Sequence, residues 1–188
     1  DLLSKLARSK FRLLFDGLNG VTGPYARNIF CDGLGFPASS IVRGNPLPDF
    51  GGQHPDPNPV YAGRFYQTMI SREAADFGAA CDSDGDRHMV MGPAAYVTPS
   101  DSLAILAEHM HLAHAYRDGI KGVARSVGTS TAVDRVAKHL GVACYETPTG
   151  WKYFGNLLEA DRISLCGEES AGASSGHIRE KDGLWAVL

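Results

Sequence analysis

Three aspartates stand two residues apart in the stretch CDSDGDR, which runs from Cys81 to Arg87. Side chains two residues apart point to the same side of an extended chain, so the carboxylates of Asp82, Asp84 and Asp86 can converge. The glycine between the last two aspartates lets the backbone bend toward a common centre. Carboxylate oxygens suit Mg²⁺, whose shell is usually completed by waters or substrate phosphate. The pattern predicts a magnesium site, and a loop of solvated charges is the alternative.

Two other chemistries use aspartate loops of this kind. A calcium EF-hand needs Gly at its sixth position and Glu at its twelfth, but counting from Asp82 gives Arg87 and Pro93, which excludes that site. A haloacid-dehalogenase phosphatase also places two aspartates after a strand, but its motif has Thr or Val where Asp86 stands, which makes it the weaker alternative. Arg87 offers a fork of donors to a phosphate, or a salt bridge that neutralises the loop.

A second group of polar residues follows in CGEESAGASSGH, residues 166–177, where the adjacent acids Glu168 and Glu169 form one acidic pair among serines and glycines. Carboxylates and hydroxyls together suit the hydroxyls of a sugar, as acceptors and as donors, and a plain surface loop is the alternative. Thr149 and Gly150 stand in the turn ETPTGWK, where they can meet a ligand. The stretch IREKDG, residues 178–183, is charged throughout and by itself is typical of a solvated loop.

Short apolar strands alternate with helical patterns along the whole chain, which predicts an α/β fold with largely parallel sheets. Ligands of such sheets collect at the carboxyl ends of the strands, where both acidic groups are expected. A helix start near Thr98 divides the chain into two consecutive α/β domains, residues 1–98 and 99–188. Strands are expected at 12–16, 39–45, 76–81, 88–92, 122–127, 142–147 and 162–170, and helices at 24–32, 61–71, 129–141 and 151–160.

The composition is that of a water-soluble globular protein, with 44% hydrophobic and 21% charged residues among 188. The net charge of −3 gives no general attraction to nucleic acid or to an anionic membrane. No apolar run is long enough for a membrane span. Phosphorylated small molecules remain possible ligands, because a local site can be basic on an acidic protein.

The four cysteines are far apart, without any Cys-x-x-Cys pair, and stand at Cys31, Cys81, Cys144 and Cys166. This usage favours buried thiols in a reducing cytoplasm over disulfides or metal ligands. The chain begins within an apparent helix and ends in the apolar run GLWAVL. We therefore expect it to be a fragment of a longer protein.

Six motifs occur in a fixed order between residue 12 and the last residue: FDGLNGVTGPY, PLPDFGGQHPDPNP, DFGAACDSDGDR, YETPTGWKYFGNLL, LCGEESAG and HIREKDGLWAVL. Together they resemble the phosphoglucomutase family, within the α-D-phosphohexomutase superfamily. Members have four domains around a central cleft, and this chain resembles most of the second and the larger part of the third.

The resemblance implies transfer of phosphate between O1 and O6 of glucose, through a phosphoserine and glucose 1,6-bisphosphate. It implies Mg²⁺ as the cofactor and a phosphorylated hexose as the substrate. The residues that match the family's motifs receive these implied roles: Asp82, Asp84 and Asp86 bind Mg²⁺; Arg87, Thr149, Gly150, Glu168 and Ser170 contact substrate; Lys181 contacts substrate and assists proton transfer.

Two departures from the family pattern bear on activity. Ser83 stands where the family usually has a glycine, and a serine there costs about 1 kcal/mol if the position needs a positive φ. The phosphoserine loop and the fourth domain have no counterpart among these residues, so the fragment alone should not turn over substrate. The alternatives are a non-catalytic relative of the family and a mutase for another hexose phosphate, such as that of mannose or glucosamine.

Overall fold

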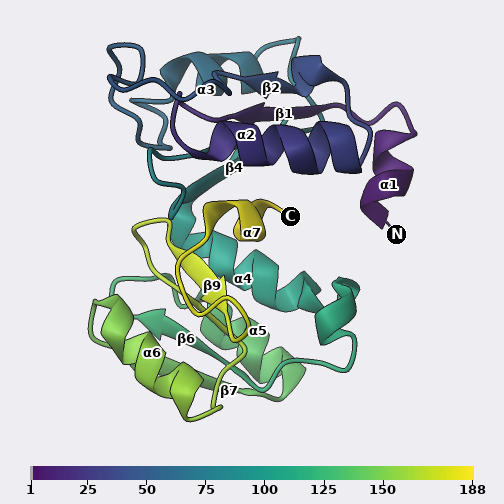
Figure 1. Cartoon of the computed structure of the whole chain (residues 1–188). Coiled ribbons are helices and arrows are strands. Elements are labelled where there is room, and N and C mark those ends of the chain that lie inside the picture. Colours follow the sequence, from purple (N-terminus) through teal and green to yellow (C-terminus); the bar gives the residue numbers. More distant parts are fainter. Residues whose placement is uncertain (1) are drawn as a thin grey trace. The chain divides into compact units, whose positions relative to one another are not determined.

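A computed structural model describes residues 2–188, which divide into two compact units (Figure 1). The first comprises the residues up to Val97 with 187–188, and the second comprises Thr98–Ala186. Each unit has helices on a mixed sheet of parallel and antiparallel strands, so the predicted fold class is confirmed. Among the described residues, no helix is long and apolar enough to cross a membrane.

The sheet of the first unit has five strands in the order β2-β1-β3-β4-β5. β1 pairs in parallel with both β2 and β3, whereas β4 and β5 continue the sheet as antiparallel strands. The carboxyl ends of β1, β2 and β3 therefore meet at one edge. The strands are β1 (Leu13–Asp16), β2 (Ile41–Val42), β3 (Phe77–Cys81), β4 (His88–Gly92) and β5 (Ala95–Val97).

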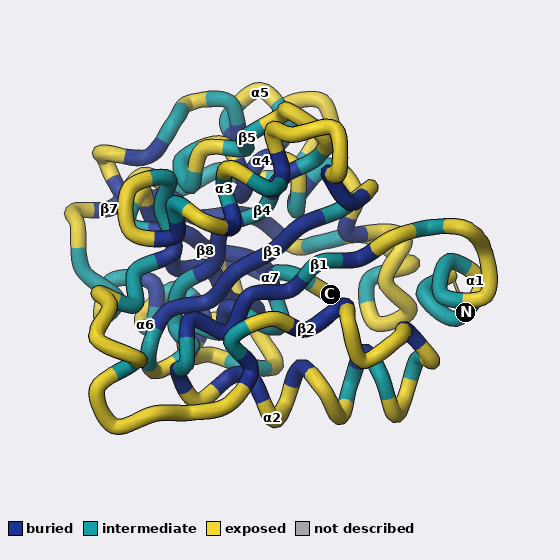
Figure 2. The backbone as a smooth tube through the Cα atoms, turned by 90° about the horizontal axis from the view of Figure 1, so that it is seen from above, coloured by how far each residue is buried: buried dark blue, intermediate teal, exposed yellow. Residues whose placement is uncertain are grey.

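Helices cover both faces of this sheet (Figure 1). On one face, Phe65 and Met69 of α3 pack against the strands in a buried cluster with Ala80. On the other face, Phe15 of β1 meets Phe30, with ring centroids 5.7 Å apart. The strands β1 and β3 are accordingly the buried centre of the unit (Figure 2). The helices are α1 (Leu2–Ala7), α2 (Thr22–Ala26), which continues as a π-helix over Arg27–Gly33, and α3 (Gly63–Met69).

The second unit has a four-stranded sheet in the order β7-β6-β8-β9. β6 pairs in parallel with β7 and β8, and only β9 is antiparallel to its neighbour among these strands. Its strands are β6 (Gly122–Ser126), β7 (Ala143–Thr147), β8 (Leu165–Gly167) and β9 (Ala173–Ser175). Its helices are α4 (Pro99–His109), α5 (Ala132–Leu140), α6 (Trp151–Glu159) and α7 (Gly183–Val187), with 3₁₀ turns at Met110–Leu112 and His114–Tyr116.

Alternating residues of the central strand β6 supply two cores. Val123 faces α4 and α5, where it is buried with Leu103 and Val133. Ala124 faces α6, where it is buried with Phe154 and Leu158. The period of two along the strand thus gives a three-layer arrangement.

Several elements differ from those predicted. The strand expected at 39–45 is reduced to two residues, because Ala38–Ser40 form a 3₁₀ turn and Arg43 takes a left-handed φ of 44°. The strands β5 and β9 were not predicted, since three residues carry too little periodicity to be recognised. Ser174 and Ser175, assigned to a loop, are fully buried in β9.

Candidate functional site

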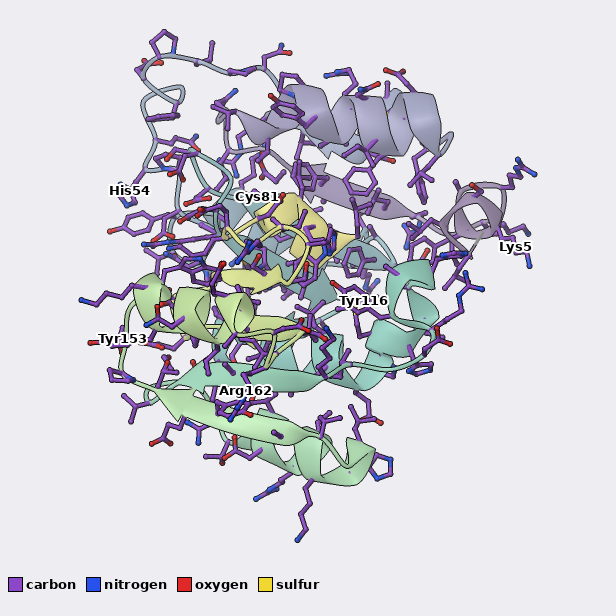
Figure 3. All side chains as sticks on the ribbon, turned by 60° about the horizontal axis from the view of Figure 1, so that its bottom comes forward. Lys5, His54, Cys81, Tyr116, Tyr153 and Arg162 are labelled. Carbon is purple, nitrogen blue, oxygen red and sulfur yellow. The ribbon has the colours of Figure 1, made fainter. Side chains whose placement is uncertain are left out.

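The acidic loop, residues 82–87, is the turn between β3 and β4. Its two ends are joined in the sheet by the pair Cys81 and His88 (Cys81 is labelled in Figure 3). The three aspartates converge as their spacing predicted: each offers a carboxylate oxygen within 4.8 Å of the others. Asp82 is buried, Asp86 half-buried and Asp84 exposed, so the group is open to solvent on one side.

Asp82 has a raised pKa. Burial raises its pKa to about 7, and the neighbouring charges of Asp86 and Asp84 add to that rise. The backbone N–H of Arg87 donates to Asp82 Oδ1 over 3.0 Å, and this hydrogen bond partly opposes the rise in pKa. A cation held among the three carboxylates would offset the burial cost and the mutual repulsion. The donor set and its geometry therefore fit a hard divalent cation such as Mg²⁺.

The backbone of the acidic loop needs glycine at one position. Gly85 has a φ of +82°, and a Cβ there would lie 2.6 Å from the methyl carbon of Thr22. Ser83 is not among the residues with positive φ in the described chain. The serine therefore carries no left-handed strain, and the change from the family's usual glycine is conformationally neutral at this position.

The glycine-rich turn after β1, residues 17–23, contacts the backbone of the acidic loop. The N–H of Val21 donates to the carbonyl of Ser83 over 2.9 Å. A Cβ on Gly20 would lie 2.6 Å from that same carbonyl oxygen, so only glycine permits this approach. The next residue, Thr22, is 3% exposed, and its hydroxyl has no hydrogen-bond partner among the described residues.

Arg87 is placed by two carboxylates. Its guanidinium lies 3.7 Å from Asp86 and 3.8 Å from Asp56, and its side chain is 42% exposed. Asp56 belongs to the proline-rich stretch 46–59, which sequence reasoning left without a role. The contact spans 31 positions of sequence, and no local pattern points to it.

A buried ion pair stands at the same edge of the sheet. Arg43 donates to Asp16 through Nε, over 2.9 Å, and through Nη2, and also to Gln53 through Nη1. Asp16 is 1% exposed and also accepts the N–H of Leu18 over 3.0 Å. A cavity of about 370 Å³ opens beside this pair, and its lining includes none of the three converging aspartates. We interpret the pair as a structural tie between the ends of β1 and β2.

In the second unit, the glutamate loop, residues 168–172, connects β8 to β9. Glu168 is 7% exposed and accepts the hydroxyl of Ser170 over 2.9 Å. The N–H of Glu168 donates to the carbonyl of Gly172, also over 2.9 Å. The two residues expected to contact substrate therefore lie together and present a carboxylate beside a hydroxyl.

The adjacent Glu169 points to a different strand. It accepts hydrogen bonds from Ser126 and Thr129, which stand at the end of β6 and in the turn that follows. The bond from Ser126 is the main reason that the pKa of Glu169 falls below its usual value. Sequence reasoning treated the two glutamates as one acidic pair, but the structure gives Glu169 the position of an anchor for the loop.

The remaining predicted residues lie in the turn before α6 and in the charged segment, residues 178–183. Thr149 is exposed in that turn, and Gly150 has a φ of 133°, which strongly favours glycine. Trp151 follows, and its indole N–H donates to the carbonyl of Arg179 over 3.2 Å. The Nζ of Lys181 lies 5.9 Å from the centroid of the same indole ring. The turn and the charged segment are thus in contact.

Lys181 also contacts the glutamate loop. A Cβ on Gly172 would lie 2.4 Å from Cδ of Lys181, so the lysine stem passes directly over that glycine. Within the second unit, the structure therefore brings together the glutamate loop, the charged segment and the turn before α6. The acidic loop with Arg87 forms a separate group on the first unit.

Comparison with known families covers nearly the whole chain. Residues 1–94 match the description "Phosphoglucomutase/phosphomannomutase, alpha/beta/alpha domain II". Residues 98–188 match domain III of the same family.

The chain is similar to longer proteins that carry the name phosphoglucomutase. It is 55% identical to a phosphoglucomutase of Rhizobium radiobacter, over 99% of this chain and 34% of that protein. It is 54% identical to human phosphoglucomutase-1, over 100% of this chain and 33% of that protein. It superposes with a TM-score of 0.95 and 50% identity on the open form of pp63/parafusin, a phosphoglucomutase from Paramecium, covering all of this chain and 34% of that one. The chain thus spans about a third of these relatives.

Proposed function

Because the chain belongs to the phosphoglucomutase/phosphomannomutase family, we propose that the protein containing it is a phosphoglucomutase. It interconverts glucose 1-phosphate and glucose 6-phosphate through a phosphoserine and glucose 1,6-bisphosphate. The observation that carries this proposal is the convergence of Asp82, Asp84 and Asp86 within 4.8 Å, in a chain 55% identical to a phosphoglucomutase. The phosphoserine belongs to another part of the protein.

Asp82, Asp84 and Asp86 would hold Mg²⁺. Bound there, the ion would supply positive charge to a phosphate, which is what phosphoryl transfer chiefly requires. The half-exposed Arg87 adds a fixed cation beside the aspartates, and its fork of donors suits phosphate oxygens. Its two carboxylate neighbours hold that fork in place without burying it.

The second unit would bind the sugar. The carboxylate of Glu168 accepts hydrogen bonds from sugar hydroxyls, and the hydroxyl of Ser170 can both donate and accept. The exposed Thr149 and the backbone at Gly150 stand at the neighbouring strand end. Lys181 supplies a positive charge for the substrate phosphate and assists proton transfer at the attacked hydroxyl. These groups orient a ring that has to bind in two directions, once for each phosphate position.

The negative φ of Ser83 bears on the alternative of a non-catalytic relative. That alternative rested on strain at the serine, and the backbone shows none there. A mutase for another hexose phosphate differs chiefly in the loop that reads the sugar. In this loop the motif GEES followed by Ala-Gly resembles that of the enzymes acting on glucose phosphates, and it favours glucose over mannose or glucosamine as the sugar.

We also propose a cytoplasmic location. Cys81 and Cys166 are fully buried, and burial raises the pKa of the Cys166 thiol well above its usual value. Buried thiols outside disulfides are typical of proteins kept in a reducing compartment.

The substitution Asp84→Ala in the full-length protein tests the proposed function. Loss of one of three charges should lower Mg²⁺-dependent conversion of glucose 1-phosphate by about a hundredfold or more. A coupled assay for glucose 6-phosphate measures the rate at several Mg²⁺ concentrations. Asp32→Ala, at an exposed aspartate of the same unit, is the matched control and should keep the rate. Near-normal turnover of Asp84→Ala would reject the metal role.

A further inference from the structure

We propose that Trp151 is a positioning residue that holds Lys181 in place for the reaction. This inference rests on the proposed mutase function and adds to it a residue that acts through the lysine. Trp151 stands at the point where the turn before α6 meets the charged segment. It therefore couples one substrate-facing loop to another.

Trp151 is itself rigidly held. It is the first residue of α6, directly after Gly150, whose unusual backbone conformation sets the direction in which the helix leaves the turn. Its ring meets Phe154 edge-on, with centroids 5.3 Å apart and planes at 86°. Phe154 is fully buried in the core beneath α6. The indole is thus supported by a part of the fold that cannot shift easily.

The indole makes two different contacts with the charged segment. Its N–H donates to the carbonyl of Arg179 over 3.2 Å. Its ring lies 5.9 Å from the Nζ of Lys181, within the range of a cation–π interaction. The lysine stem meanwhile lies on Gly172, so both its stem and its charged end have defined neighbours.

The contact at Arg179 explains why the position of Lys181 depends on the indole. Arg179 has a φ of 69°, a conformation that is unfavourable for a residue with a side chain. Three contacts hold it there: its own N–H donates to the carbonyl of Ser175 over 2.8 Å, its carbonyl accepts the indole N–H, and its guanidinium pairs with Glu159. If the indole bond is lost, the backbone at Arg179 can relax, and Lys181, two residues later, moves with it.

Other contacts hold the ends of this part of the chain. His177 Nδ1 is 2.8 Å from both the Tyr116 and the Ser175 hydroxyls. Asp182 accepts the N–H of Trp185 over 2.9 Å. These contacts fix the region as a whole. The indole contacts act on the backbone and the charge next to Lys181.

A double-mutant cycle in the full-length enzyme tests the inference. Trp151→Phe keeps an aromatic ring on Phe154 but removes the N–H donor and weakens the cation–π contact. We expect kcat/KM for glucose 1-phosphate to fall about tenfold, because small displacements of a reacting group are costly. In the Lys181→Ala background, the same substitution should change kcat/KM by less than about twofold. A merely structural role would give the same loss in both backgrounds.

Trp185→Phe is the matched control, since it removes the second indole of this chain next to the same segment. We expect it to change kcat/KM by less than about twofold in either background. If Trp151→Phe does not give folded protein, Trp151→Tyr replaces it, because tyrosine also keeps a ring and lacks the indole N–H.

The outcomes separate this inference from the proposed function. Equal losses in both backgrounds, or no loss in the wild-type background, would overturn the role of Trp151 while the mutase function stands. An absence of turnover in the wild-type enzyme would reject the proposed function instead. Hydrogen exchange then decides the inference: Trp151→Phe should speed exchange at the amides of 179–181, and unchanged exchange would overturn it.

Discussion

At the scale of single residues, the acidic loop distinguishes a necessary glycine from a replaceable one. Gly85 combines a positive φ with close contact to Thr22, so a side chain there meets both backbone strain and a steric clash. Ser83 does not have a positive φ. It contacts the turn after β1 through its backbone, because its carbonyl accepts the N–H of Val21, and this bond does not depend on the side chain. The backbone at this position therefore does not require the glycine that the family usually has there.

The substitution Thr22→Val should stabilise the protein. The Thr22 hydroxyl is buried without a hydrogen-bond partner among the described residues, and valine has nearly the same shape. Removal of a buried, unpaired hydroxyl is worth about 1 kcal/mol of unfolding free energy. Urea titration of the full-length protein measures the change as a higher unfolding midpoint.

Thr129→Val is the matched comparison for Thr22→Val, because both threonines are 3% exposed. The Thr129 hydroxyl bonds Ser126 and Glu169, so its loss should lower the urea midpoint. A drop in midpoint for Thr22→Val as well would show that its hydroxyl has a partner in solution.

At the scale of elements, the sequence predicts those features that depend on residues close together in the chain. The aspartates of the acidic loop stand two residues apart within one turn, and Gly85 lets that turn bend. Their convergence could therefore be predicted from the sequence. The ties of Arg87 to Asp56 and of Trp151 to Arg179 join positions far apart in the chain. No periodicity encodes such pairs, because they depend on how strands and turns are placed in the folded unit.

The anchoring of the glutamate loop by Glu169 should make stability depend on pH. The folded-state pKa of Glu169 lies below its usual value, so the ionised group contributes stability above the pKa of the unfolded chain. That contribution is lost as the pH falls through the folded value. The gap in melting temperature between wild type and Glu169→Gln should therefore shrink from pH about 6 to pH about 3.

Thermal unfolding of the full-length protein at several pH values measures this gap. Glu180→Gln, at an exposed glutamate of the same unit, controls for the loss of one surface charge. A gap for Glu169→Gln that stays constant over this range would contradict the proposed anchor.

At the scale of the whole molecule, each unit has helices on a mixed sheet, and its candidate functional loops lie at strand ends. The first unit carries the candidate metal ligands, and the second carries the candidate sugar contacts. The sequence predicts two domains because strands and helices alternate in both halves and a helix start near Thr98 separates them. It did not predict β9, which pairs with β8 and so turns two serines of the expected loop into core residues.

The chain of 188 residues, expressed alone, should not interconvert glucose phosphates. It contains the candidate metal and sugar loops but no phosphoserine loop, so the group that passes on the phosphate is missing. The measurement is a coupled assay with glucose 1-phosphate, Mg²⁺ and glucose 1,6-bisphosphate, with the full-length protein as positive control. Measurable conversion by the chain alone would show that a nucleophile within these residues has been overlooked.

The pairing of Cys81 with His88 across the ends of the acidic loop has a kinetic consequence. Both ends of the loop are fixed in the sheet, and its middle is fixed by the hydrogen bond from Val21 to Ser83. Its backbone is therefore ordered without a bound ion. Ion capture at such a turn requires little loss of chain entropy. If the three aspartates hold Mg²⁺ as proposed, exchange of that ion should follow the rate at which it loses its own water, and should be largely insensitive to solvent viscosity.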